Sequence, residues 1–174
     1  RLGRRVFGEH VALEQERIAR TEPFRDLNNI ASPPQVLRET FDLMPRDTSG
    51  QWVNIASRLE NLGEAFNGYI SCLEEGLLSG CPAARRQVEA CAQQCETHAS
   101  DVSYFNGLLE QAAHAGIADS LKNRILLGVD AAKTAYRQLG QYLMIDYLPG
   151  ARIDDAVGLE EYRFASRRFL GTDI

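Results

Sequence analysis

The fold of this chain is decided by residues 48–80, which read TSGQWVNIASRLENLGEAFNGYISCLEEGLLSG. Apolar side chains recur there at steps of three and four residues, which is the period of an α-helix. They are Trp52, Ile55, Leu59, Leu62, Phe66, Ile70, Leu73 and Leu77, with Tyr69 beside them. Thr48 and Ser49 can cap the start of this helix, and Gly80 followed by Pro82 can end it. One apolar face on so long a helix must be buried against other helices, so the stretch predicts an all-α protein.

The same period appears on both sides of the central stretch. It predicts helices over about residues 4–20, 33–44, 82–99, 101–116, 119–148 and 159–169. Pro82 is predicted to open one of these helices and Asp101 to cap the next, and the pattern from residue 119 is the longest without interruption. Gly63 is predicted to bend or split the central helix, because glycine costs about 1 kcal/mol relative to alanine in a helix interior.

The segments between these helices read as connectors. Residues 21–31 are polar and interrupted by Pro23, and residues 151–157 follow a Pro-Gly pair. No alternating strand pattern holds for more than a few residues, and no internal repeat can be aligned. We therefore predict one all-α region over residues 1–174, an array of about six or seven mostly antiparallel helices.

Composition limits the classes of partner. The chain has 174 residues, is 44% hydrophobic and carries a net charge of −5, which is atypical of a nucleic-acid-binding protein. No apolar run approaches the roughly 18 residues of a membrane span, and no apolar signal-peptide core is present. These features favour a cytoplasmic location without nucleic acid or membrane. The chain opens at Arg1 in mid-pattern, and Thr172 with Asp173 would cap a further helix, so we expect a piece of a longer protein.

Charged side chains form clusters that the helical pattern predicts to be solvated. Arginines gather near both ends of the chain, at Arg1, Arg4 and Arg5 and again at Arg163, Arg167 and Arg168. Paired acids occur at Glu74-Glu75, Asp154-Asp155 and Glu160-Glu161. The two helical pairs, Glu74-Glu75 and Glu160-Glu161, do not converge on one site, because neighbouring residues of a helix point about 100° apart. We interpret all of these groups as solvated surface.

The sharpest candidate for chemistry is a set of metal-ligating residue types at helical spacing. Cys91, Cys95 and His98 lie at i, i+4 and i+7, so they share one face of a helix, and Cys72 or Cys81 can supply a fourth ligand for zinc. The two cysteines of this face also fall on the apolar stripe of their helix. Free cysteine is among the most buried residue types, so packing in the core is the favoured interpretation.

Other chemical motifs are weaker. His10 and His114 lie on or near apolar helical faces, and no His-Glu-x-x-His or comparable zinc pair includes them. Asp146 and Tyr147 follow Tyr142 at the end of a predicted helix, where they can line a cleft, although a tyrosine packed on a neighbouring element is favoured. The sequence contains no nucleophile elbow and no phosphate-binding glycine loop.

Three stretches together resemble a known family. They are PPQVLRETFDLMP at residues 33–45, the central stretch at residues 48–80, and GLEEYRFASRRFLGTDI at residues 158–174. Their order and spacing resemble the domain-of-unknown-function 885 family of bacterial proteins. The resemblance implies an all-helical body like that of deep-cleft zinc metallopeptidases, with a His-Glu motif in the C-terminal half. No residue of this chain matches that motif, so no catalytic or metal residue is carried over.

Three functional hypotheses follow. In the first, the chain is the upstream, non-catalytic helical portion of a zinc-metallopeptidase-like hydrolase, whose zinc would activate water for attack on a peptide substrate and whose remaining chain would be the partner. In the second, it is a helical module that binds a protein or a ligand without catalysis. In the third, Cys91, Cys95 and His98 bind metal. If the chain is cut from a larger helical body, its cut faces should be apolar, which predicts an exposed apolar patch larger than roughly a few hundred Å² or self-association that hides it.

Overall fold

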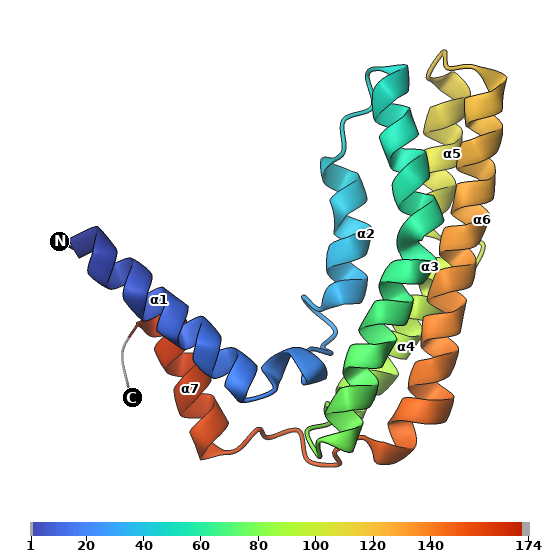
Figure 1. The fold of residues 1–174 in the computed structure, drawn as a ribbon. Helices are drawn as coiled ribbons and strands as arrows, with labels where there is room; N and C mark the ends of the chain where they lie inside the picture. Colours follow the sequence, from blue (N-terminus) through green and yellow to red (C-terminus); the bar gives the residue numbers. More distant parts are fainter. Residues whose placement is uncertain (1, 172–174) are drawn as a thin grey trace.

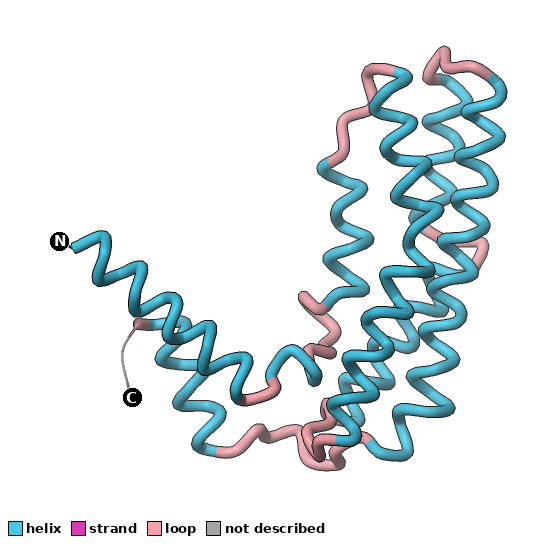
Figure 2. The backbone as a smooth tube through the Cα atoms, viewed as in Figure 1, coloured by secondary structure: helices cyan, strands magenta, loops and turns pink. Residues whose placement is uncertain are grey.

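The computed structural model describes residues 2–171, which form helices joined by short connections (Figures 1 and 2). The elements are α1 (Leu2–Ala19), η1 (Glu22–Arg25), α2 (Pro33–Leu43), α3 (Ser49–Leu78), α4 (Arg85–Ala99), α5 (Tyr104–His114), α6 (Asp119–Tyr142), η2 (Leu143–Tyr147), η3 (Leu148–Gly150) and α7 (Leu159–Leu170). Within the described residues the only extended pairing is an isolated bridge between Ala84 and Arg152. The all-α prediction is confirmed, and the predicted cap at Thr172 and Asp173 lies outside the described residues.

Helices α3, α4, α5 and α6 form a bundle, with α2 against one side of α3 (Figure 1). Their buried side chains make one continuous core in which α3 lies along α6. Gly128 of α6 is needed at this contact, since a Cβ there would meet the Cβ of Leu59 at 3.0 Å. The predicted apolar stripe of α3 is the part of the core that the sequence located best, because Trp52, Ile55 and Phe66 are all buried.

The predicted bend of the central helix at Gly63 is wrong. Helix α3 runs for 30 residues without interruption. Its start is fixed by a capping box: the Thr48 hydroxyl accepts a hydrogen bond from the backbone N–H of Gln51, and the Gln51 side chain accepts one from the backbone N–H of Thr48. Burial of one whole face against α6 outweighs the poor helix propensity of the three glycines at Gly63, Gly68 and Gly76.

Helix α4 begins later than predicted. Pro82 does not open the helix, which starts at Arg85. The residues before it are extended and pair with the connection that leads to α7: the backbone N–H of Arg85 donates to the carbonyl of Arg152 at 2.7 Å, and the N–H of Arg152 donates to the carbonyl of Ala83 at 3.0 Å. Tertiary hydrogen bonding therefore replaces the first helical turn that proline favours in isolation.

Helix α5 is capped by Ser103 and not by Asp101. The hydroxyl of Ser103 accepts a hydrogen bond from the backbone N–H of Phe105 at 3.3 Å. Asp101 lies in the turn before the cap, where its carbonyl accepts from the Asn106 side chain at 2.6 Å. The predicted cap was two residues early, and serine and aspartate are comparable N-cap residues, so the sequence alone does not separate them.

The predicted continuous helix from residue 119 to residue 148 ends early. The α-helical part stops at Tyr142, and Leu143–Tyr147 form a π-helical turn followed by a short 3₁₀ turn. The wider turn places Leu143 and Tyr147 in the core, where both are fully buried. Helix α3, and not this helix, is therefore the longest.

The predicted connector at residues 21–31 contains a helical turn. Glu22–Arg25 form η1, with Pro23 in its first turn. The turn lies against α3 at Gly76, where a Cβ would overlap the carbonyl oxygen of Phe24. The hydroxyl of Tyr69 donates a hydrogen bond to the backbone carbonyl of Asp26 at 2.7 Å. These contacts anchor the connector to the bundle.

Helices α1 and α7 come from opposite ends of the chain and lie side by side, away from the bundle (Figure 1). We call α1, η1 and α7 together the arm. The apolar side chains that patterned α1 remain exposed, among them Phe7 at 69% and Ile18 at 63%. On α7, Phe164 is buried while Phe169 is 89% exposed. The arm thus keeps much of its apolar surface in contact with solvent.

Candidate functional site

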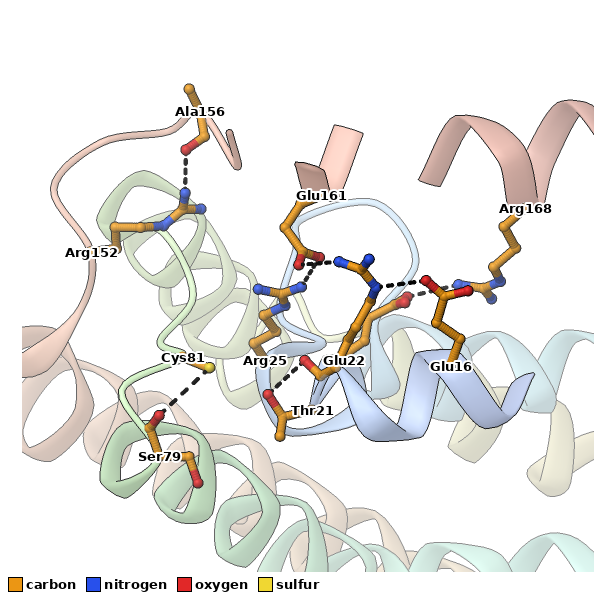
Figure 3. Close-up of polar contacts among 11 residues, drawn as sticks. Glu16, Thr21, Glu22, Arg25, Ser79, Cys81, Arg152, Ala156, Glu161 and Arg168 are labelled. Carbon is orange, nitrogen blue, oxygen red and sulfur yellow. Dashed lines mark hydrogen bonds and ion pairs between the residues drawn. The ribbon is translucent and has the colours of Figure 1, made fainter. Parts of the chain in front are cut away.

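The charged side chains of the arm converge where it meets the bundle (Figure 3). A cavity of about 350 Å³ lies there, lined by η1, the start of α4, the connection that precedes α7, and α7 itself. We call this cavity the junction pocket. More charged residues line the junction pocket than line the hollow between α4 and α6 or the hollow between α2 and α3. The junction pocket is therefore the first candidate for a functional site.

Glu161 of α7 is the centre of the first charge cluster. It accepts a hydrogen bond from Arg20 at 3.0 Å and pairs with Arg25 through its second oxygen. Its side chain is 25% exposed. The prediction that the Glu160-Glu161 pair is solvated surface is therefore wrong for Glu161, because α1 and η1 fold over it; Glu160 is exposed as predicted.

The arginines near the end of α7 pair with α1 and η1. Arg167 forms an ion pair with Glu16. The Nε of Arg168 lies 3.5 Å from a carboxylate oxygen of Glu14, and its Nη1 lies 2.7 Å from a carboxylate oxygen of Glu22. The predicted solvated face is confirmed for Arg163 and Arg168, which are exposed, while Arg167 is half-buried. The sequence did not reveal that Arg167 and Arg168 pair with carboxylates of α1 and η1 that are remote in sequence. We call these contacts, together with those of Glu161, the ion-pair seam.

The seam also stabilises ionised carboxylates and covers one aromatic ring. A hydrogen bond from Arg17, with the charges of Arg17 and Arg168, holds the pKa of Glu14 below its ordinary value. The guanidinium of Arg20 lies 4.8 Å from the centre of the Phe164 ring, and that of Arg167 lies 5.8 Å from it. Phe164, the buried residue of α7, thus makes cation–π contacts with two arginines of the seam.

The charges that line the junction pocket are largely paired with one another. Arg86 forms an ion pair with Asp155 at 2.6 Å, and Arg152 donates a hydrogen bond to the carbonyl of Ala156. Asp26 differs, because burial raises its pKa and the nearby Glu22 carboxylate raises it further. No histidine or cysteine is among the lining residues. This arrangement suits holding the arm in place, and it offers no nucleophile with an adjacent base.

The predicted metal candidates lie elsewhere, inside the bundle. Cys91 and Cys95 are each 1% exposed. His98 is half-buried, with its ring centre 4.9 Å from that of Tyr136, and burial lowers its pKa. Burial also raises the pKa of Cys95 to about 12, which opposes the thiolate form that a metal requires. Within residues 2–171, no three His, Cys, Asp or Glu side chains are grouped so that they could hold a metal ion.

The remaining candidate residues are two histidines and three residues near the end of α6. His10 and His114 are exposed. Tyr147 is fully buried and its hydroxyl accepts a hydrogen bond from the backbone N–H of Ala83 at 2.8 Å, which is the favoured packing of a tyrosine on a neighbouring element. Asp146 is exposed and Tyr142 is half-buried. These residues do not combine into a site.

The sequence of the chain also matches a known protein family. All of residues 1–174 match the family described as "Bacterial protein of unknown function (DUF885)". The chain belongs to the DUF885 family. No curated protein matches it. The resemblance inferred from the three sequence stretches is confirmed at the level of the family. Among the helices that the structure describes, none has the length and apolar composition needed to cross a membrane.

Proposed function

We propose that this DUF885 chain is the upstream, non-catalytic helical portion of a zinc-metallopeptidase-like hydrolase, in which it forms scaffold or one wall of a substrate cleft. The observation that carries the proposal is the arm. Its two helices are joined by an ion-pair seam and expose apolar side chains, including Phe7 on α1 and Phe169 on α7. Such a surface suits burial against further protein.

The chain's own residues do not fit zinc. In the donor set with the right chemistry, Cys91 and Cys95 are buried among core side chains and His98 is half-buried, and the junction pocket is lined by arginines paired with carboxylates. In the proposal, zinc is therefore held by residues outside this chain. The contribution of the chain is to position helices, and no catalytic step is assigned to its side chains.

Hydrogen exchange tests the scaffold role directly. The backbone amides of α1 and α7 are compared in this chain alone and in a longer native protein that contains it. The proposal expects exchange in both helices to slow at least about tenfold in the longer protein, because docking makes their opening less favourable. The amides at the α3–α6 contact serve as the control, since the residues of this contact are already buried in the chain alone. Unchanged exchange in α1 and α7 would refute the scaffold role.

A second candidate function is a helical module that binds a separate protein or ligand without catalysis. One observation favours it. A groove of about 630 Å³ lies between α4 and α6, with Ala92, Gly140 and Met144 among its apolar lining and Glu96 and Arg137 among its charged residues. Its size is that of an ordinary ligand site. Protection of α1 and α7 by a separate protein, with none from the rest of the native chain, would support this function over the first.

A further inference from the structure

A large open hollow lies between the end of α2 and the first half of α3. It has a volume of about 740 Å³, and a smaller hollow of about 170 Å³ adjoins it. Thr40, Arg58 and Asn61 line both hollows, so the two lie side by side and are described together as one groove. We call it the α2–α3 groove. Its volume is within the usual range for a small-molecule site.

Arg58 is the only charged residue that lines this groove, and it has no ion-pair or hydrogen-bond partner among the described residues. The sequence of α3 around Arg58 explains why its side chain has no ion-pair partner on the same helix. The residues three and four positions away on either side are Asn54, Ile55, Asn61 and Leu62, so no carboxylate is at the spacing that forms pairs along a helix.

Neighbouring arginines contrast with Arg58. Arg124 holds both carboxylate oxygens of Glu60 at 2.7 and 2.6 Å, and Arg38 pairs with Asp42 at 2.7 Å. These cations are neutralised inside the molecule. Arg58 therefore keeps five N–H donors available to a ligand, in the planar fork that matches a carboxylate.

The rest of the groove limits the ligand further. Leu43 is 86% exposed at the rim and Met44 is half-buried beside it, which gives an apolar wall. The Asn61 amide donates one hydrogen bond to the Ser57 carbonyl at 2.7 Å, and Arg58 is the one cation among the lining residues. One cation next to an apolar wall suits a ligand with one negative charge and an apolar chain.

We propose that the α2–α3 groove binds an aliphatic monocarboxylate, with the carboxylate on Arg58 and the aliphatic chain on Leu43 and Met44. The carboxylate can belong to the C-terminus of a short peptide or to a free branched-chain acid, because both present the same group. This inference is independent of the proposed scaffold function. The groove and its cation lie within this chain whatever contacts the arm makes.

Titration calorimetry on the native protein tests the proposal with three probes. These are acetyl-leucyl-leucine with a free carboxylate, the same dipeptide as its C-terminal amide, and 4-methylpentanoate. The matched variants are Arg58→Gln and Arg85→Gln, since Arg85 is also exposed but lies on α4 outside the groove. Both substitutions are at exposed positions, so the fold is expected to be retained.

Binding of a carboxylate probe, with affinity at least about tenfold weaker in Arg58→Gln and unchanged in Arg85→Gln, supports the proposal. The C-terminal amide of the dipeptide is expected to bind the wild-type protein as weakly as the free-carboxylate dipeptide binds the Arg58→Gln variant. Binding of 4-methylpentanoate together with the dipeptide indicates a free acid as the source, and binding of the dipeptide alone indicates a peptide terminus. No carboxylate binding at millimolar concentration, or equal affinity in Arg58→Gln, would overturn the proposal.

Discussion

Arg20 at the end of α1 and Glu161 in the first turn of α7 are 141 residues apart in the sequence and form a 3.0 Å ion pair. Arg25 of η1 pairs with the same carboxylate. One glutamate therefore joins the first two helical elements of the chain to the last. The arm exists as a unit because of contacts of this kind, and its surface is the basis of the proposed scaffold role.

Glu161→Gln is expected to loosen the arm. The substitution removes the charge that Arg20 and Arg25 share, at a cost of about 1 kcal/mol because the pairs are only partly buried. Limited proteolysis should cleave the connection at residues 152–158 faster in this variant, while the bundle stays intact. Glu160→Gln is the control, since Glu160 is exposed and pairs with Arg163 of its own helix at 3.9 Å. Equal cleavage rates in the two variants would contradict the role of Glu161.

Gly76→Ala is expected to destabilise the junction. A Cβ at this position would overlap the carbonyl oxygen of Phe24, so η1 must move off α3. Overpacking of this kind costs about 1–3 kcal/mol. Gly68→Ala, in the same helix with nothing within 4 Å of the added Cβ, should instead stabilise by up to about 1 kcal/mol. Thermal denaturation of both variants checks the opposite signs, and a stabilised Gly76→Ala variant would show that η1 does not lie against α3.

The stability of the bundle is expected to fall as the pH is lowered from 7 to 5.5. Burial lowers the pKa of His98 below its ordinary value of 6.5, so the unfolded chain binds more protons than the folded one in this window. The contribution of His98 is complete above pH 6.5 and is lost on acidification. The melting temperature of His98→Leu should depend less on pH over this range. His114→Gln should keep the wild-type dependence, because His114 is exposed; an unchanged slope in His98→Leu would contradict the burial of His98.

The thiols are expected to react at very different rates. Cys72 is exposed, while Cys91 and Cys95 are buried with raised pKa values. A disulfide reagent at pH 8 should modify Cys72 in the folded protein and reach Cys91 and Cys95 only on unfolding. Addition of cobalt should give no thiolate charge-transfer absorption. Such absorption, lost in Cys95→Ala, would revive the metal-binding hypothesis.

The sequence predicted the helices and the core better than it predicted the site. The stripe that begins with Trp52 was correct because periodicity reports which face is buried. The π-helical turn at Leu143 and the late start of α4 at Arg85 were missed, since both depend on contacts with other elements. Local spacing does not carry that information.

The ion-pair seam was missed for a similar reason. Glu161 and Arg167 read as solvated because each was compared only with neighbours on its own helix. Their partners, Arg20 and Glu16, are more than a hundred residues away. The sequence signals were arginines near both ends of the chain and an acidic pair at Glu160-Glu161, and these do not specify pairing.

The zinc content of a longer native protein that contains this chain, measured by elemental analysis beside that of the chain alone, tests the central proposal most directly. The proposal predicts about one zinc per molecule in the longer protein, as for a catalytic site, and none in the chain. Stoichiometric zinc in the chain alone would contradict it and return attention to Cys91, Cys95 and His98. Zinc in neither form would contradict it as well and favour the non-catalytic helical module.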